Sequence, residues 1–226
     1  MQQSTVKMMD RVKNLAQGVL EDLKNLLSPF RARPPIRDRD ELAKFIDENA
    51  AFTVQKGIYE YSRARAGHYA KVLFGEAEFR DAVDVSRWQA YPLGLAMVGE
   101  LAEGLLRPHA GDDAGRQLEA LRALVLSVYD GYAKPALLTQ TQWADGRADL
   151  DRRLQLIGLH PPKRAMDVPE PFIKPYFALM PVHKSLRGRD RPTTHNYLKV
   201  TMCNVHEELV RRMDAGAVAA SLRMGG

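Results

Sequence analysis

Residues 76–107 read EAEFRDAVDVSRWQAYPLGLAMVGELAEGLLR, and we expect this segment to form a long helical region. Pro92 lies in its middle, and proline lacks the backbone N–H and clashes with the preceding turn, so we expect a kink or a break there. The apolar run from Leu93 to Leu106 is the longest in the chain, but Glu100 and Glu103 interrupt it. A spanning helix needs about 20 apolar residues with few charges. The sequence therefore predicts no transmembrane segment.

Helical signals also appear on both sides of this segment. Asp38 followed by Glu41 resembles a capping box, and apolar residues then continue a helix towards Gly67. Near the other end of the chain, Thr193 or Thr194 is the expected N-cap of the last long helix. Both patterns predict where long helices begin.

Regular apolar stripes support the same fold class. Residues 118–128 and 198–209 place apolar side chains three or four positions apart, which is the period of a helix. Alternating β-branched runs separated by hairpin turns do not occur in the sequence. We therefore predict an all-α fold, with a single globular multi-helix domain over residues 41–226.

The N-terminal part of the chain has a different organisation. Residues 1–30 carry one apolar stripe and predict an amphipathic helix, and residues 31–40 form a proline- and arginine-rich stretch that predicts an extended linker. The stripe can dock on the chain's own body, on another subunit or partner, or on a membrane surface. Acidic residues on its polar face weaken the membrane alternative, and we expect a protein partner or self-association.

Composition indicates an ordinary folded protein of the cytoplasm. The chain has 226 residues, of which 45% are hydrophobic and 27% charged, and this length can bury a core without disulfides. Cys203 is the single cysteine, so an oxidising compartment is not required. The N-terminus lacks the apolar core of a signal peptide. We therefore predict a cytoplasmic location.

The sequence lacks several complete catalytic motifs. A zinc-binding histidine pair would need histidine where Val210 follows His206 and Glu207. No serine has the glycine spacing of a nucleophile elbow, and the glycine-rich nucleotide-binding loops are also absent. Cys203 lies three residues before His206, but an unpaired cysteine is more often a small buried hydrophobe than a nucleophile. We expect neither a metal nor a cofactor.

One candidate ligand site combines aromatic and charged residues of two predicted helices. Tyr59 and Arg63 follow helical spacing on the helix before Gly67, while three further residues do so on the following long helix: Asp84, Trp88 and Tyr91. Facing each other, these side chains would form either a pocket for a small polar ligand or an interhelical salt-bridge network that only fixes packing.

A second candidate is an anion-binding site before and within the last long helix. Arginine forks match phosphate oxygens, and free backbone N–H groups at a helix start favour anions. The alternative is a solvated basic loop that balances residues 76–158, in which acidic residues outnumber basic ones. The residues of this predicted site are Arg187, Arg189, Arg191, Thr194, His195 and Lys199.

The leading functional hypothesis is a non-catalytic intracellular helical binding or adaptor protein, with a phosphate-bearing ligand as one candidate. It is favoured because the sequence shows no complete catalytic constellation. The alternative is a helical enzyme or small-ligand carrier that uses the polar and aromatic cluster. Nucleic-acid binding is disfavoured, because a dense basic stripe with interleaved aromatic residues is missing.

Overall fold

The computed structural model describes residues 34–182 and 190–224. The predicted N-terminal amphipathic helix lies outside these residues, and so do Arg187 and Arg189 of the predicted anion site. Within the described ranges, every regular element is an α-helix or a short 3-10 turn. The prediction of an all-α fold is confirmed.

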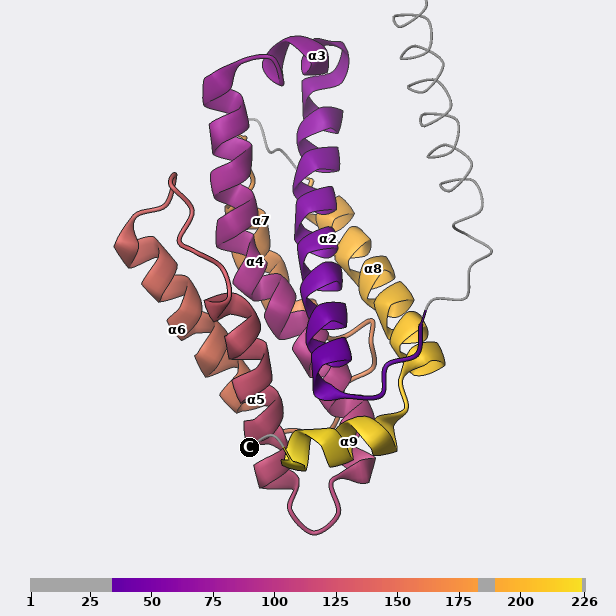
Figure 1. Cartoon of the computed structure of the whole chain (residues 1–226). Helices are drawn as coiled ribbons and strands as arrows, with labels where there is room; N and C mark the ends of the chain where they lie inside the picture. Colours follow the sequence, from indigo (N-terminus) through magenta and orange to yellow (C-terminus); the bar gives the residue numbers. More distant parts are fainter. Residues whose placement is uncertain (1–33, 183–189, 225–226) are drawn as a thin grey trace, which may run out of the picture. The chain divides into compact units, whose positions relative to one another are not determined.

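Two long helices, α2 (Arg39–Ala66) and α4 (Ala77–Leu106), form an antiparallel hairpin that has α3 (Ala70–Leu73) at its far end (Figure 1). Asp38 caps α2 as predicted, because its carboxylate accepts two backbone N–H groups of the first turn. Gly67 ends the helix with a φ of 54°, a left-handed conformation that glycine adopts without steric cost, and begins the short turn η2 (Gly67–Tyr69).

The two helices of the hairpin approach each other closely at Gly94. A Cβ atom at Gly94 would lie 2.8 Å from the carbonyl oxygen of Ala50 and 3.0 Å from Cγ1 of Val54. Only glycine leaves room for such a contact between backbones.

Helix α4 runs through Pro92 without a break, so of the two predicted outcomes, a kink or a break, the break is wrong. The residues that follow Pro92 are buried by neighbouring helices, with Leu154 and Val125 both near Gly99. We attribute the continuity to this packing, because burial of many apolar side chains outweighs the loss of one helical hydrogen bond.

Helices α5 (Ala114–Asp130) and α6 (Gln140–Ile157) contact α4 and each other (Figure 1). A short turn, η3 (Arg107–His109), precedes α5. Thr139 and Gln142 form a complete capping box at the start of α6, which satisfies two backbone N–H groups. The capped start fixes where the side chains of α6 meet α4.

The chain then crosses the body through η4 (Glu170–Phe172) and α7 (Ile173–Ala178) before it enters α8 (Arg191–Arg212) and α9 (Ala215–Met224). Helix α8 contacts α2, α4 and α7, while α9 contacts α2, α4 and α5. Tyr176 of α7 is fully buried and donates a hydrogen bond to the carbonyl oxygen of Val54 in α2.

Helix α8 begins earlier than predicted. Its N-cap is Asp190, and Pro192 lies in the first turn, where the missing N–H of proline costs nothing. Thr193 and Thr194 therefore lie inside the helix, and the expectation that one of them caps it is wrong. Thr194 is also buried.

The predicted linker ends earlier than its charged sequence indicated. Ile36 is fully buried, its N–H donates to the carbonyl oxygen of Arg212, and its own carbonyl accepts the N–H of Asp214. Residues 36–40 therefore belong to the helical body, and the predicted linker range of 31–40 is too long at this end. One apolar side chain within a charged stretch gave too weak a signal for the prediction.

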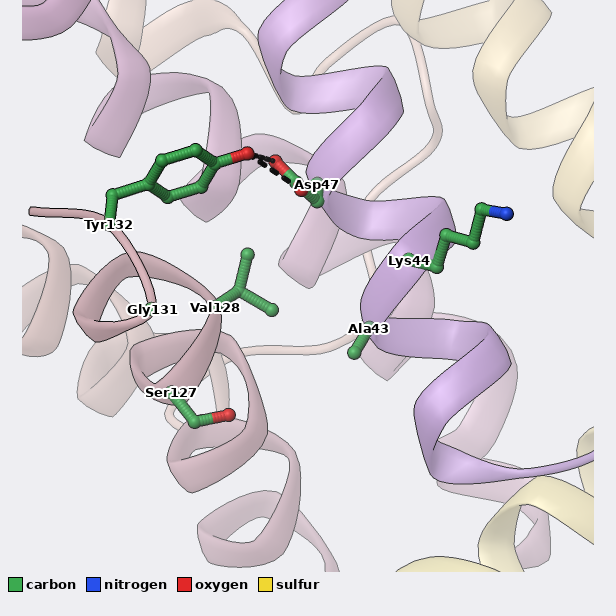
Figure 2. Close-up of a pocket in the computed structure, with 7 residues that line it drawn as sticks. All are labelled: Ala43, Lys44, Asp47, Ser127, Val128, Gly131 and Tyr132. Atoms are coloured by element: carbon green, nitrogen blue, oxygen red, sulfur yellow. Dashed lines mark hydrogen bonds between the residues drawn. The ribbon is translucent and has the colours of Figure 1, made fainter.

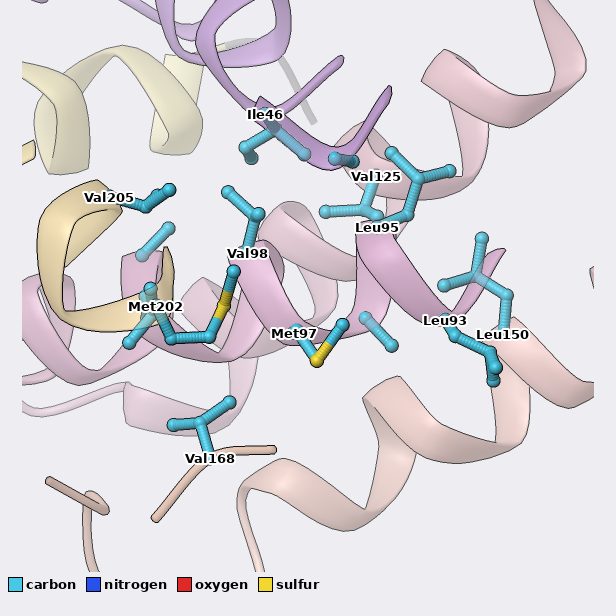
Figure 3. Packing of buried hydrophobic residues seen from close by; sticks show 14 of the residues in the cluster. Ile46, Leu93, Leu95, Met97, Val98, Val125, Leu150, Val168, Met202 and Val205 are labelled. Atoms are coloured by element: carbon cyan, nitrogen blue, oxygen red, sulfur yellow. The ribbon is translucent and has the colours of Figure 1, made fainter. Parts of the chain in front are cut away.

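One continuous hydrophobic core joins the described helices. Figure 3 shows side chains of α2, α4, α5, α6 and α8 meeting around the second half of α4. They include Ile46, Leu95, Val125, Leu150 and Met202, all of which are almost completely inaccessible to solvent.

Among the helices in the part of the chain that the structure describes, none has the combination of length and apolar character that a membrane crossing requires.

Candidate functional site

Five aromatic side chains gather where α4, α5 and α6 meet, and we call them the aromatic cluster. Neighbouring ring centroids lie 4.2–6.3 Å apart, in stacked and edge-to-face arrangements that are favourable for aromatic pairs. Both tryptophans of the chain belong to it. The members are Trp88 and Tyr91 of α4, Tyr129 of α5, Tyr132 just after α5, and Trp143 of α6.

Asp47 of α2 joins this cluster through two tyrosine hydroxyl groups. Tyr91 donates to Oδ1 of Asp47 at 2.6 Å, and Tyr132 lies 3.0 Å from Oδ1 and 2.9 Å from Oδ2. Figure 2 shows the contact between Tyr132 and Asp47 across the two helices. Within the described ranges, Asp47 forms no ion pair with a lysine, arginine or histidine. Its negative charge is therefore hydrogen-bonded but not neutralised.

The surroundings keep these tyrosines protonated. Burial raises the pKa of Tyr91 well above its usual range, and the hydrogen bond to Asp47 adds to the shift. Burial and the same carboxylate also raise the pKa of Tyr132, and burial raises that of Tyr129. Loss of a phenol proton would place a second negative charge beside Asp47. The phenols therefore keep their protons near neutral pH and act as hydrogen-bond donors.

A cleft of about 420 Å³ opens to solvent beside this carboxylate, between α2 and α5 (Figure 2). Its walls are mostly small side chains, which leave room for an incoming group, and its charged rim comes from α2. The lining residues are Ala43, Lys44 and Asp47 of α2, with Ser127, Val128, Gly131 and Tyr132 on the other side.

The structure brings together only part of the predicted polar cluster. Trp88 and Tyr91 belong to the aromatic cluster, whereas Tyr59 is 46% exposed and packs on Phe74. Arg63 forms an ion pair with a glutamate of its own helix, and Asp84 does so with an arginine of α4. The described residues show no ion pair between Arg63 and Asp84, so these two residues do not form the salt-bridge network that was one of the two alternatives.

Four members of the site were not among the residues predicted from the sequence: Asp47, Tyr129, Tyr132 and Trp143. Tyr129 and Tyr132 are three residues apart at the end of a helix, which was a usable signal for a shared face. Asp47 carried no such signal, because its tyrosine partners come from distant parts of the chain.

Of the predicted anion-binding residues that the structure describes, His195 and Lys199 are already engaged by a carboxylate. Nε2 of His195 lies 3.0 Å from Oε1 of Glu170, and Nζ of Lys199 lies 2.8 Å from the same oxygen. Lys199 and then His195 lower the pKa of Glu170 through these hydrogen bonds. Arg191 is exposed on the first turn of α8, and Thr194 is buried beside it. Phosphate binding here stays a prediction, and a bound anion would compete with the carboxylate of Glu170.

Two buried carboxylates in the apolar half of α4 were also missed as interaction sites. Glu103 forms a bidentate ion pair with Arg107, at 2.7 and 2.8 Å. Arg107 also donates to the carbonyl oxygens of Ile157 and His160. Nζ of Lys163 lies 2.7 Å from Oε1 of Glu100, although not at an angle that makes a hydrogen bond. These contacts fasten the segment after α6 to α4, which is a structural role.

Cys203 is exposed on α8, contrary to the expectation that an unpaired cysteine is buried. Its position on the outer side of an amphipathic helix explains the difference, because the neighbouring Met202 occupies the core. Among the residues with a described placement, no three histidine, cysteine, aspartate or glutamate side chains converge as a metal site would require.

The chain matches no protein-family model, no curated protein and no solved structure. Its function is therefore inferred from the geometry of the site.

Proposed function

We propose that this chain is a non-catalytic binding protein of the cytoplasm, whose cleft between α2 and α5 receives a positively charged side chain of a partner protein. One observation carries the proposal. The carboxylate of Asp47 lies at the rim of an open cleft, is held in place by Tyr91 and Tyr132, and has no cationic partner among the described residues.

The two hydroxyl groups orient Asp47 without cancelling its charge. A neutral donor satisfies a lone pair of a carboxylate but leaves the net charge, whereas a lysine or arginine side chain would neutralise it. Because the phenols already hold the carboxylate, little side-chain entropy remains to be lost when a partner binds.

Tyr132 supports the same class of partner. It remains 38% exposed while its hydroxyl group is fixed on Asp47, so part of the ring is accessible to an incoming group. A cation over an aromatic ring gains about 0.5–1 kcal/mol at an exposed site. A carboxylate beside an accessible aromatic ring therefore favours a cationic group over a neutral or acidic one.

The geometry favours binding over catalysis. Proton-transfer catalysis near neutral pH needs a group whose pKa lies near the working pH. The phenols beside Asp47 have pKa values raised away from that range, mainly by burial. The proposed cleft does not include the predicted phosphate contact at the start of α8. There, Glu170 already engages His195 and Lys199.

Intrinsic fluorescence can test the proposal, since both tryptophans of the chain lie in the aromatic cluster. Short oligolysine and oligoarginine peptides should give a saturable change, whereas oligoglutamate at equal ionic strength should give none. Asp47→Asn keeps the shape of the acceptor but removes its charge, and should weaken peptide binding about five- to tenfold, as expected for a partly exposed charged hydrogen bond.

Glu48→Gln is the matched control, because it removes the same charge from the adjacent, exposed residue of α2. It should leave the affinity within about twofold, since an exposed charge in salt contributes little. Equal losses in Asp47→Asn and Glu48→Gln would show that only the overall charge matters. Absence of any saturable response in the unmodified chain would also contradict the proposal.

A further inference from the structure

A second cleft, of about 290 Å³, lies on the α6 side of the aromatic cluster. It is formed by α4 and α6, and Trp88 and Tyr129 contribute to its wall. Polar groups from both helices also line it, among them Gln89 of α4 with Gln142 and Asp145 of α6. Its size is near the lower limit for small-molecule sites, which span about 300–1,000 Å³.

Gly146 determines how closely α6 packs at this cleft. A Cβ atom on Gly146 would lie 3.1 Å from the hydroxyl oxygen of Tyr129 and 3.5 Å from Cγ of Pro92. Gly146 itself lines the cleft, so its missing side chain leaves part of the space open. Any larger residue would fill this space or push α6 away.

The charges at the cleft are unequally satisfied. Asp149 forms ion pairs with Arg152 and with Arg153, the latter at 2.6 Å. The nearby Arg147 is engaged by Asp130 in a bidentate pair with both distances at 2.7 Å. Asp145 is exposed and has neither an ion pair nor a hydrogen bond from its side chain to any other described residue. The cleft therefore holds one uncompensated negative charge.

An aromatic wall with a single free carboxylate selects for one ligand chemistry. Organic cations bind where an aromatic surface and a carboxylate meet, because each stabilises the positive charge and the aromatic surface also covers the alkyl groups. An anion would be repelled by Asp145. A bare metal ion would need several converging ligands, whereas no three carboxylate, histidine or cysteine side chains of the described residues gather as a metal site would require.

We infer that the cleft between α4 and α6 is a second binding site, which takes a small organic ammonium ion between Trp88 and Asp145. The site is separate from the proposed partner-binding cleft, since Asp47 does not line it. The two clefts share only the aromatic cluster, which borders both.

The probe for this site is choline, and its control is 3,3-dimethyl-1-butanol, the neutral molecule of the same shape. Two-dimensional ¹H–¹⁵N NMR can follow the indole N–H of Trp88 and the backbone N–H of Gly146 during a titration at constant ionic strength. Choline should shift both signals saturably. The neutral alcohol should shift them less and bind at least about threefold more weakly, as expected when a cation–π contact is lost.

Asp145→Asn should lower the affinity for choline about two- to fivefold, which is the range for an exposed ion pair. Asp81→Asn removes the same charge from an exposed position of α4 that does not line the cleft, and should leave the affinity unchanged. Gly146→Ala should abolish binding, because the added methyl group enters the cleft beside Tyr129.

Three results would overturn the inference: no saturable shift with choline, equal binding of choline and the neutral alcohol, or unchanged affinity in Asp145→Asn. Folding of each variant is checked by the dispersion of the same NMR spectrum. Failure here is distinguishable from failure of the partner-binding proposal, because the probes and the variants differ and the signal of Gly146 reports on this cleft alone.

Discussion

The two halves of α4 belong to one continuous helix but lie in opposite surroundings. Before Pro92 the buried residues of the helix are few: Val83, Ser86, Ala90 and Tyr91. After it, every residue from Pro92 to Glu103 is buried. Figure 1 shows the first half extending towards α3, and Figure 3 shows the second half surrounded by side chains from other helices.

This difference changes what a charged side chain does in each half. Asp84 and Arg87 in the first half form a pair that is partly open to water, at side-chain exposures of 48% and 35%. Glu103 in the second half is 9% exposed and depends on Arg107 for compensation. The same kind of ion pair is therefore weak at one end of the helix and indispensable at the other. Both candidate clefts lie near Pro92, the boundary between the two halves, where aromatic residues are buried but carboxylates still reach solvent.

The largest effect should come from Arg107→Ala. It leaves Glu103 buried without its partner and removes the donor to the carbonyl oxygens of Ile157 and His160. We expect a loss of about 3–5 kcal/mol in the free energy of unfolding. Urea unfolding followed by circular dichroism measures it. Arg107→Lys, which keeps the charge but not the bidentate geometry, should lose less, and a loss below about 1 kcal/mol in Arg107→Ala would contradict the buried-pair interpretation.

A middle-sized effect should follow from Gly94→Ala. Its Cβ would meet the backbone of Ala50 at 2.8 Å, so the two helices must separate, at a cost of about 1–3 kcal/mol. Gly104→Ala is the control in the same helix, because its Cβ would meet only Pro162, at an ordinary 3.6 Å. Thermal unfolding should show Gly104→Ala as neutral or slightly stabilising, since alanine favours a helix interior. If the two variants behave alike, the close crossing does not exist.

The smallest effect should come from Arg63→Ala in α2, opposite the first half of α4. Arg63 is 60% exposed at its side chain, and its one ion-pair partner among the described residues is Glu60. We expect a change below about 0.5 kcal/mol in the free energy of unfolding. A double-mutant cycle with Asp84→Ala should show no coupling between the two residues. A loss above about 2 kcal/mol would mean that Arg63 does form a buried interhelical pair.

Local signals in the sequence predicted the fold, and contacts between distant residues limited the prediction of the site. Asp38 and Gly67 marked the ends of α2, because capping and left-handed backbone geometry depend on a few adjacent residues. The start of α8 was misjudged, since Pro192 and the threonines after it gave competing signals.

Tertiary packing decided the features that the sequence did not reveal. Pro92 stays within a helix because the surrounding core packs around it. The residues next to Pro92 in the sequence do not reveal this packing. A salt-bridge network that includes Arg63 and Asp84 was one of two alternatives, but each of these residues pairs with a residue three positions away on its own helix. Asp47 meets Tyr91 and Tyr132 only after three helices have packed together. A helical period shows which residues share a face, but it does not show which face meets which.

Ile36 has a consequence for the order in which the chain folds. Its backbone forms hydrogen bonds with Arg212 and Asp214, where α8 passes into α9. The start of the described chain therefore pairs with a segment near its C-terminal end. Contacts between positions so distant in sequence carry a high loop-closure entropy and form slowly. During synthesis the start of α2 has no such partner until α8 has left the ribosome. The hairpin of α2 and α4 can pair earlier, because its contacts are closer in sequence, and the closure at Ile36 is expected to come last.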